Sequence, residues 1–158
     1  MLARSHVDLH NTRLGIDRVK KLSDRIVGVG PIGIGLDGIL GFVPGLGVAY
    51  SLIAGAMLLS SAVRARASAG TLLHMGGLLA VDALLDVPAG TPVLGLASSF
   101  ADTLFTGHKW SANLLLKHMD DTIYIEGTRE KVKDRPEYAE LLARIRAGKE
   151  KRRIVFLG

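Results

Sequence analysis

The chain has 158 residues, of which 48% are hydrophobic and 5% aromatic, and its formal net charge is +5. This length suits one domain with a sizeable core, and the absence of cysteine excludes disulfides, zinc–thiolate sites and thiol nucleophiles. The basic balance suits nucleic acid or an anionic membrane surface. Because the basic ends hold few aromatic residues and no nucleic-acid motif, we expect no nucleic-acid partner.

Positive charge is confined to the two ends of the chain. All Lys and Arg residues except Arg64 and Arg66 lie before residue 26 or after residue 108. A helix of a soluble domain normally carries one charged face, so an apolar middle between basic ends points toward lipid. The positive-inside rule then predicts that both termini are cytoplasmic.

Residues 1–25 are polar and lack the apolar run of a cleaved signal peptide. Apolar residues recur at helical spacing in their second half, which predicts an amphipathic helix from Arg13 to Arg25. In residues 26–35 glycine alternates with apolar residues around one proline. Because Gly and Pro disfavour a helix, we expect a loop or a short extended segment there.

Residues 38–63 contain no charged side chain, and a bilayer core needs about 20 apolar residues in a helix. Pro44 is tolerable in a first turn, so we predict a helix from Pro44 to Val63 that crosses the membrane. Its glycines and serines would let a neighbouring helix approach closely. Residues 64–70 form a natural turn.

A second apolar helix is predicted over residues 71–87, returning across the membrane by about residue 91, and a third from Pro92 to Leu116. Two re-entrant helical hairpins are the alternative to these crossings. From residue 119 onward charges of both signs alternate, which predicts a soluble tail that contributes little to the stability of the apolar core.

The tail itself has readable elements. Residues 122–126 have the β-branched and aromatic composition of a short strand. Pro136 begins a predicted helix that runs to Ala147 and stops at Gly148. We therefore divide the chain into a polar amphipathic N-terminal segment (1–25), an apolar helical membrane domain (26–118) and a charged soluble tail (119–158).

Two stretches of the middle segment share one order of residues, D-x3-G-x2-P-x2-G, with one residue fewer before the second proline. The first copy consists of Asp37, Gly41, Pro44 and Gly47, and the second of Asp86, Gly90, Pro92 and Gly95. Each copy has a carboxylate, a Gly/Pro break and then a new apolar segment. This repeated order predicts two copies of one helix–turn–helix unit. The expected fold is all-α, with Gly/Pro-broken apolar helices in two pseudo-repeats.

These two motifs, together with Asp24, Gly35 and Leu36 before them, resemble the bacterial "domain of unknown function 4112" family over residues 20–118. The resemblance implies a small helical, membrane-embedded domain of the bacterial inner (cytoplasmic) membrane, without an assigned activity. The chain departs from the family pattern after each final glycine, where Val48 and Leu96 replace an acidic residue. The family pattern also has a basic, Asn-containing segment after the second motif, of which this chain keeps His108, Lys109 and Asn113.

The motif carboxylates Asp37 and Asp86 have two interpretations. An ionisable group inside a membrane segment often marks an ion or proton path. An aspartate before a Gly/Pro break can instead accept hydrogen bonds from the freed backbone N–H groups. The structural role explains both copies at once, and the ion path remains its alternative.

Two further patterns suggest chemistry. Asp82 and Asp86 share a helix face and could form a polar seam with Asp102 and His74, usable for a metal or a proton relay or only for interhelical hydrogen bonds. No metal motif accompanies them. Residues 28–33 satisfy the dinucleotide string GxGxxG but lack the βαβ context it needs, so we expect neither a metal nor a cofactor.

The chain also lacks a nucleophile elbow, a P-loop and a supported Ser/His/Asp order, so we expect no enzyme. The function favoured by these patterns is a membrane scaffold or accessory subunit that packs against other membrane proteins or itself. One alternative is a minimal ion or proton channel or transporter that uses Asp37, Asp82 and Asp86. The other is a soluble helical bundle.

Overall fold

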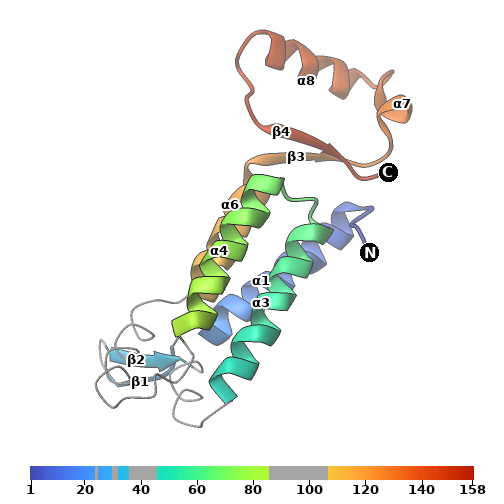
Figure 1. Cartoon of the computed structure of the whole chain (residues 1–158). Coiled ribbons are helices and arrows are strands. Elements are labelled where there is room, and N and C mark those ends of the chain that lie inside the picture. The colour runs from blue at the N-terminus through green and yellow to red at the C-terminus, as the bar shows by residue number, and fades with distance from the viewer. Residues whose placement is uncertain (24, 30–31, 36–45, 86–106) are drawn as a thin grey trace.

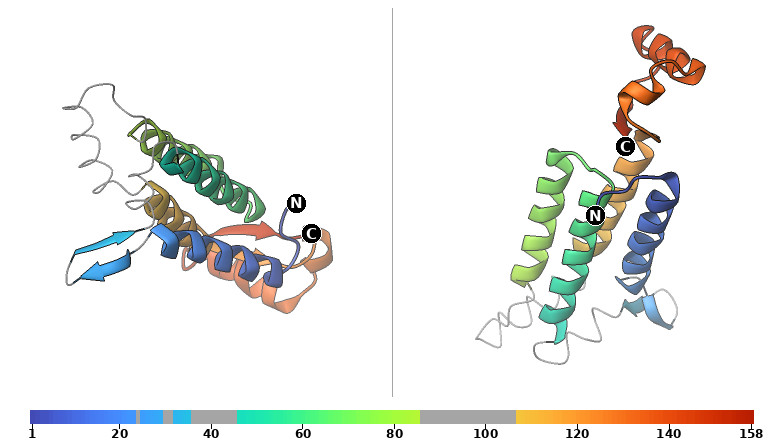
Figure 2. Two further views of the ribbon diagram at one scale, coloured as in Figure 1. Left: turned by 90° about the horizontal axis from the view of Figure 1, so that it is seen from below. Right: turned by 90° about the vertical axis from the view of Figure 1, so that its right-hand side faces the viewer.

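The computed structural model describes residues 1–23, 25–29, 32–35, 46–85 and 107–158. Four helices form its body: α1 (His6–Ser23), α3 (Leu46–Arg64), α4 (Ala69–Leu85) and α6 (Gly107–Asp120) (Figure 1). Helices α1 and α4 each contact both α3 and α6, and consecutive helices run in opposite directions (Figures 1 and 2). The fold is thus an antiparallel four-helix bundle, which confirms the predicted all-α class.

The core of the bundle receives one large, fully buried side chain from each helix. These side chains are Ile16, Leu58, Met75 and Leu115, each 0% exposed. Buried alanines lie between them, which lets the helix backbones approach closely: Ala54, Ala62 and Ala112. Each of the four helices therefore buries an apolar side in the core.

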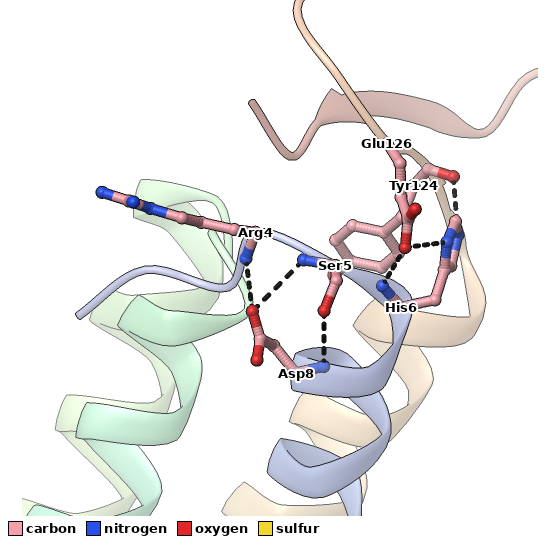
Figure 3. Close-up of polar contacts among 6 residues, drawn as sticks. All are labelled: Arg4, Ser5, His6, Asp8, Tyr124 and Glu126. Atoms are coloured by element: carbon pink, nitrogen blue, oxygen red, sulfur yellow. Dashed lines mark hydrogen bonds and ion pairs between the residues drawn. The ribbon is translucent and has the colours of Figure 1, made fainter.

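Helix α1 begins seven residues before its predicted start because Ser5 and Asp8 form a capping box. The Asp8 N–H donates to Ser5 Oγ at 3.1 Å, and Asp8 Oδ2 accepts from the N–H groups of Ser5 at 3.2 Å and Arg4 at 2.8 Å (Figure 3). The Arg4 N–H is the main cause that lowers the pKa of Asp8. These bonds satisfy donors that a helix start leaves open.

The described ends of the other predicted bundle helices agree with the structure within two to four residues. Helix α3 starts two residues after the predicted Pro44, and α4 starts two residues before the predicted residue 71. Helix α6 continues past the predicted Leu116 to Asp120. The predicted start of that helix, at Pro92, lies outside the described residues.

A Schellman motif ends α3. The Ala67 N–H donates to Ala62 O at 2.9 Å and the Arg66 N–H to Val63 O at 3.0 Å, while Arg66 itself has φ of 54°. This left-handed position normally belongs to glycine. An arginine in this conformation therefore indicates that its side chain makes contacts that glycine could not make.

An antiparallel hairpin of β1 (Arg25–Val29) and β2 (Ile32–Gly35) follows α1. It agrees with the expected short extended segment. The hairpin lies at one end of the bundle, which we call the hairpin end, while both termini lie at the other, the tail end (Figure 1). Within the described ranges, no helix combines the length and hydropathy that a membrane crossing needs, so the predicted spanning helices are not supported there.

The tail forms a small unit of its own at the tail end. It contains β3 (Thr122–Ile125), α7 (Arg129–Val132), α8 (Pro136–Arg146) and β4 (Arg153–Phe156), and β3 pairs with β4 in parallel. The predicted strand and helix of the tail are confirmed, and Gly148 with φ of 69° follows α8. Strand β4 was not predicted.

A side chain of β3 and the residues at the end of β4 contact the bundle. Leu157 is 0% exposed and belongs to the same apolar cluster as the bundle core, and the Tyr124 hydroxyl donates to Ala65 O at 2.9 Å. Arg66 donates to Phe156 O at 2.6 Å and to Ala3 O at 3.4 Å, which is the use of its side chain. The structure thus differs from the expectation that the tail adds little to the core.

The N-terminus closes the outer edge of β3. The His6 N–H donates to Glu126 Oε1 at 2.6 Å, and the two His6 ring nitrogens lie 3.0 Å from Glu126 Oε1 and 3.1 Å from Tyr124 O (Figure 3). Hydrogen bonds from His6 lower the pKa of Glu126. An exposed strand edge can pair with other chains, and His6 occupies this one.

Candidate functional site: a buried carboxylate–histidine pair and an apolar helix face

Most of the repeated motif lies outside the described residues. Gly47 is the second residue of α3, whereas nothing is described for the other seven motif residues: Asp37, Gly41, Pro44, Asp86, Gly90, Pro92 and Gly95. The described segments that flank both copies begin or end at the hairpin end (Figure 1). The equivalence of the two copies stays a prediction.

Asp82 lies in the last turn of α4 and is only 7% exposed. Its Oδ1 accepts the Gly107 N–H at 2.8 Å, and its Oδ2 lies 2.8 Å from His108 Nδ1, with His108 1% exposed. Both contacts are to the first two residues of α6. The carboxylate therefore satisfies a donor at a helix start and lies at the positive end of the helix dipole.

The approach of Asp82 to α6 depends on a glycine. A Cβ added at Gly107 would lie 2.7 Å from Asp82 Cβ and 2.8 Å from its Oδ1. Such distances are too short for any side chain. Gly107 thus permits the Asp82 carboxylate to reach the helix backbone.

The predicted polar seam is only partly described, because Asp86 and Asp102 lie outside the described residues. His74 is exposed on α4, so it does not join the buried Asp82. The partner of Asp82 is His108, a pairing absent from the predicted seam. A buried carboxylate needs a donor, and residues 67–108 hold only two basic side chains, His74 and His108, so this pairing was readable.

The chemistry available to this pair is limited by its burial. Ser111, one turn further along α6, is 0% exposed and its Oγ has no hydrogen-bond partner among the described residues. Aspartate, histidine and serine thus lie near one another in a bundle interior, but both Asp82 oxygens are engaged in holding α6. Among the described residues, no group of three or more His, Asp or Glu could hold a metal ion.

A groove of about 920 Å³ lies between α8 and the β3–β4 sheet. Its apolar lining includes Ile123, Ile125 and Leu141. Its most buried charge is Glu150, whose oxygens accept from Arg152 at 2.7 Å and Arg144 at 3.2 Å. Hydrogen bonds from Arg152 lower the pKa of Glu150 to about 2. This carboxylate serves the fold of the tail.

The outer side of α3 and α4 is apolar and exposed. Its large side chains are Leu52 (61% exposed), Ile53 (63%), Met57 (50%) and Val63 (50%) on α3, and Leu73 (78%) and Val81 (47%) on α4. The exposed residues between them are small, except for His74. We call this surface the α3–α4 face. From Leu52 to Val63 on α3 and from Leu73 to Val81 on α4 it exposes no Lys, Arg, Asp or Glu, and the exposed Arg64 lies at its edge, whereas α1 exposes Arg18 and Lys21 on its outer side.

Comparisons with known proteins place the chain in one family. Neither curated proteins nor solved structures gave a match. A family described as "Domain of unknown function (DUF4112)" matches residues 13–119, from within α1 to the last turn of α6. The match covers the bundle with its two motifs and stops before the β3–β4 unit, and the chain belongs to this DUF4112 family.

Proposed function

We propose that this chain is a non-enzymatic, membrane-associated helical protein that acts as a scaffold or accessory subunit, and that it associates through the α3–α4 face. The observation that carries the proposal is the exposure of large apolar side chains on a face whose one neighbouring charge among the described α3 and α4 residues is Arg64, at its edge. Monomeric soluble proteins rarely expose contiguous apolar patches of more than a few hundred Å².

The free energy available for association depends on the apolar area that a partner would remove from water. The six large side chains of this face expose an apolar area on the order of 600 Å², and each Å² removed from water contributes roughly 25 cal/mol. A partner that covers the face must itself be apolar, since the face offers almost no hydrogen bonds. Lipid chains and the apolar helices of membrane proteins meet this requirement.

The channel alternative receives less support from the described residues. Of its three carboxylates only Asp82 is described, and both its oxygens are bound at the start of α6. A carboxylate that holds a helix in place is poorly suited to exchange protons or ions. The soluble-bundle alternative is separated from the proposal by the experiment below.

The test is flotation of the full chain with vesicles of phosphatidylglycerol and phosphatidylethanolamine, together with carbonate washing of bacterial membranes. The double variant Ile53→Glu with Leu73→Glu places charge on the α3–α4 face and should abolish flotation. The matched control is Val7→Glu, because Val7 is 67% exposed on α1, and it should float like the wild type. Recovery of the wild type in the soluble fraction, without flotation, would refute membrane association.

A further inference from the structure

We propose that the α3–α4 face binds a second copy of this chain, in a two-fold dimer whose centre is the antiparallel contact of α4 with its copy. The proposal rests on the proposed function and names the partner at the same face. It follows from three observations: the placement of glycines, the order of large and small residues along α4, and the distribution of charge.

Helix α4 carries glycines that its own chain does not explain. A Cβ added at Gly55 of α3 would contact Leu79 at 3.7 Å, and one at Gly107 would clash with Asp82, so both glycines serve packing within the chain. At Gly70, Gly76 and Gly77 an added Cβ meets nothing within 4 Å. Glycine inside a helix is unfavourable relative to alanine. The close approach of a helix from another chain would explain why these positions of α4 are glycine.

The close helix approach expected at the glycines of α3 is found at Gly55, which is buried against α4 of its own chain. Gly55 is therefore not available to a second copy, whereas the three glycines of α4 have open space beside them. Gly15 on α1 is also open, so an open glycine alone does not identify an interface, and Gly15 supplies a control.

The exposed residues of α4 are self-complementary in size. In an antiparallel pair centred at position 75, residues whose numbers add to 150 lie opposite each other. The resulting pairs are Ala69 with Val81, Gly70 with Ala80, Leu73 with Gly77, and His74 with Gly76. Every pair contains at least one small residue, and the most exposed side chain, Leu73 at 78%, lies opposite an open glycine. Two-fold interfaces require such reciprocal complementarity.

Charge favours a second copy at this face over any other face. The chain has a net charge of +5, so two copies repel each other in most orientations. A pairing through α1 would bring Arg18 and Lys21 of one copy near those of the other. The centre of the α3–α4 face, around α4, carries no Lys, Arg, Asp or Glu among its exposed residues, and Arg64 lies only at the edge of the face. The exposed area of the face approaches the roughly 800 Å² per partner of a standard interface.

Cysteine cross-linking tests the geometry directly because the chain contains no cysteine. His74→Cys lies beside the proposed two-fold axis, and Asn113→Cys is the control on the exposed side of α6. We expect oxidation of vesicle-bound or detergent-solubilised protein to give a disulfide dimer of His74→Cys and to leave Asn113→Cys monomeric. Equal cross-linking of both variants, or of neither, overturns the proposal.

Gly77→Leu tests the same contact without cysteine. It occupies the space opposite Leu73 of the copy and should weaken the dimer at least tenfold in analytical ultracentrifugation in detergent. Because this space is open within the chain, the melting temperature of the monomer should not fall. Gly15→Leu is the matched control and should leave the dimer unchanged. A Gly77→Leu dimer as tight as the wild type would contradict the proposal.

The two proposals fail in different ways. Gly77→Leu keeps the face apolar and should still float with vesicles. A wild-type protein that floats but stays monomeric overturns the dimer and leaves membrane association intact. A protein that dimerises through His74→Cys but does not float supports the dimer and overturns membrane association.

Discussion

Single residues in this protein fix how helices meet. Gly107 lets the Asp82 carboxylate reach the backbone of α6, and His108 beside it contacts the other carboxylate oxygen. Arg66 occupies a left-handed position at the end of α3 because its guanidinium donates to two carbonyls of distant segments. At position 107 only a residue without a Cβ fits beside Asp82, and at position 66 the side chain must reach the two carbonyls. Tertiary contacts therefore decide which residue each position tolerates.

Gly107→Ala should destabilise the bundle by about 1–3 kcal/mol, the range observed for overpacked interiors. The added Cβ would lie 2.7–2.8 Å from Asp82 atoms, so α4 and α6 must separate or the carboxylate must lose its hydrogen bond. Urea unfolding followed by circular dichroism measures the change. Gly15→Ala is the control in open space and should stabilise α1 slightly; equal stability of the two variants would argue against the Gly107 contact.

At the scale of elements, the start of α4 is tied to the end of α6. Ser68 Oγ accepts the Thr71 N–H at 3.2 Å, as a helix cap does. The Ser68 N–H donates to His118 Nε2 at 3.3 Å, and His118 Nδ1 lies 3.1 Å from Thr71 Oγ1. Since Nε2 accepts a hydrogen bond, the neutral ring with its proton on Nδ1 fits this arrangement.

Stability should therefore fall as His118 is protonated. Burial, and then the charge of Arg153, lower the pKa of His118 from 6.5, so the unfolded chain binds the proton more readily than the folded one. The contribution is complete above pH 6.5 and is lost as the pH falls from there through the lowered pKa. Free energies of unfolding measured from pH 7.5 downward should show this decrease.

If protonation of His118 causes this decrease in stability, a variant without a titratable side chain at position 118 should not show it. His118→Gln should flatten the pH dependence just below 6.5, whereas His74→Gln, on the exposed side of α4, should leave it unchanged. A wild-type decrease that persists in His118→Gln would refute the assignment.

At the scale of the whole molecule, the tail is part of the folded structure, although the family match ends at residue 119. The β3–β4 sheet directs one face toward the bundle, where Tyr124 of β3 and Leu157, directly after β4, make contacts. Its other face lines the groove beneath α8, where Tyr138 and Phe156 meet edge to face at 5.9 Å. The sheet thus joins two apolar regions.

Leu157→Ala should destabilise the bundle by about 2–5 kcal/mol, as expected for a fully buried leucine. Leu157 is 0% exposed within the cluster that contains the bundle core. Urea unfolding of the full chain measures the effect. Leu141→Ala, in α8 and away from the bundle, is the control and should cost less. A bundle of unchanged stability in Leu157→Ala would restore the view of the tail as an independent appendage.

Local chemistry in the sequence determined much of this protein. Apolar runs predicted α3 and α4, and Pro136 with Gly148 predicted α8, because helix starts and stops depend on neighbouring residues. The capping box of Ser5 and Asp8 is equally local, and it was readable although the helix was predicted to begin at Arg13. The two motifs also sufficed to identify the family.

Only the tertiary structure decided which distant groups meet. Asp82 pairs with His108 across two helices, and β4 pairs with β3 after a long crossover, because such contacts depend on how elements pack and not on periodicity. A helix such as α3, which has no charged residue before its last residue Arg64, fits lipid and a bundle core equally well in sequence. In the structure one side of α3 is buried in the bundle, and Leu52 and Ile53 are exposed on the other side.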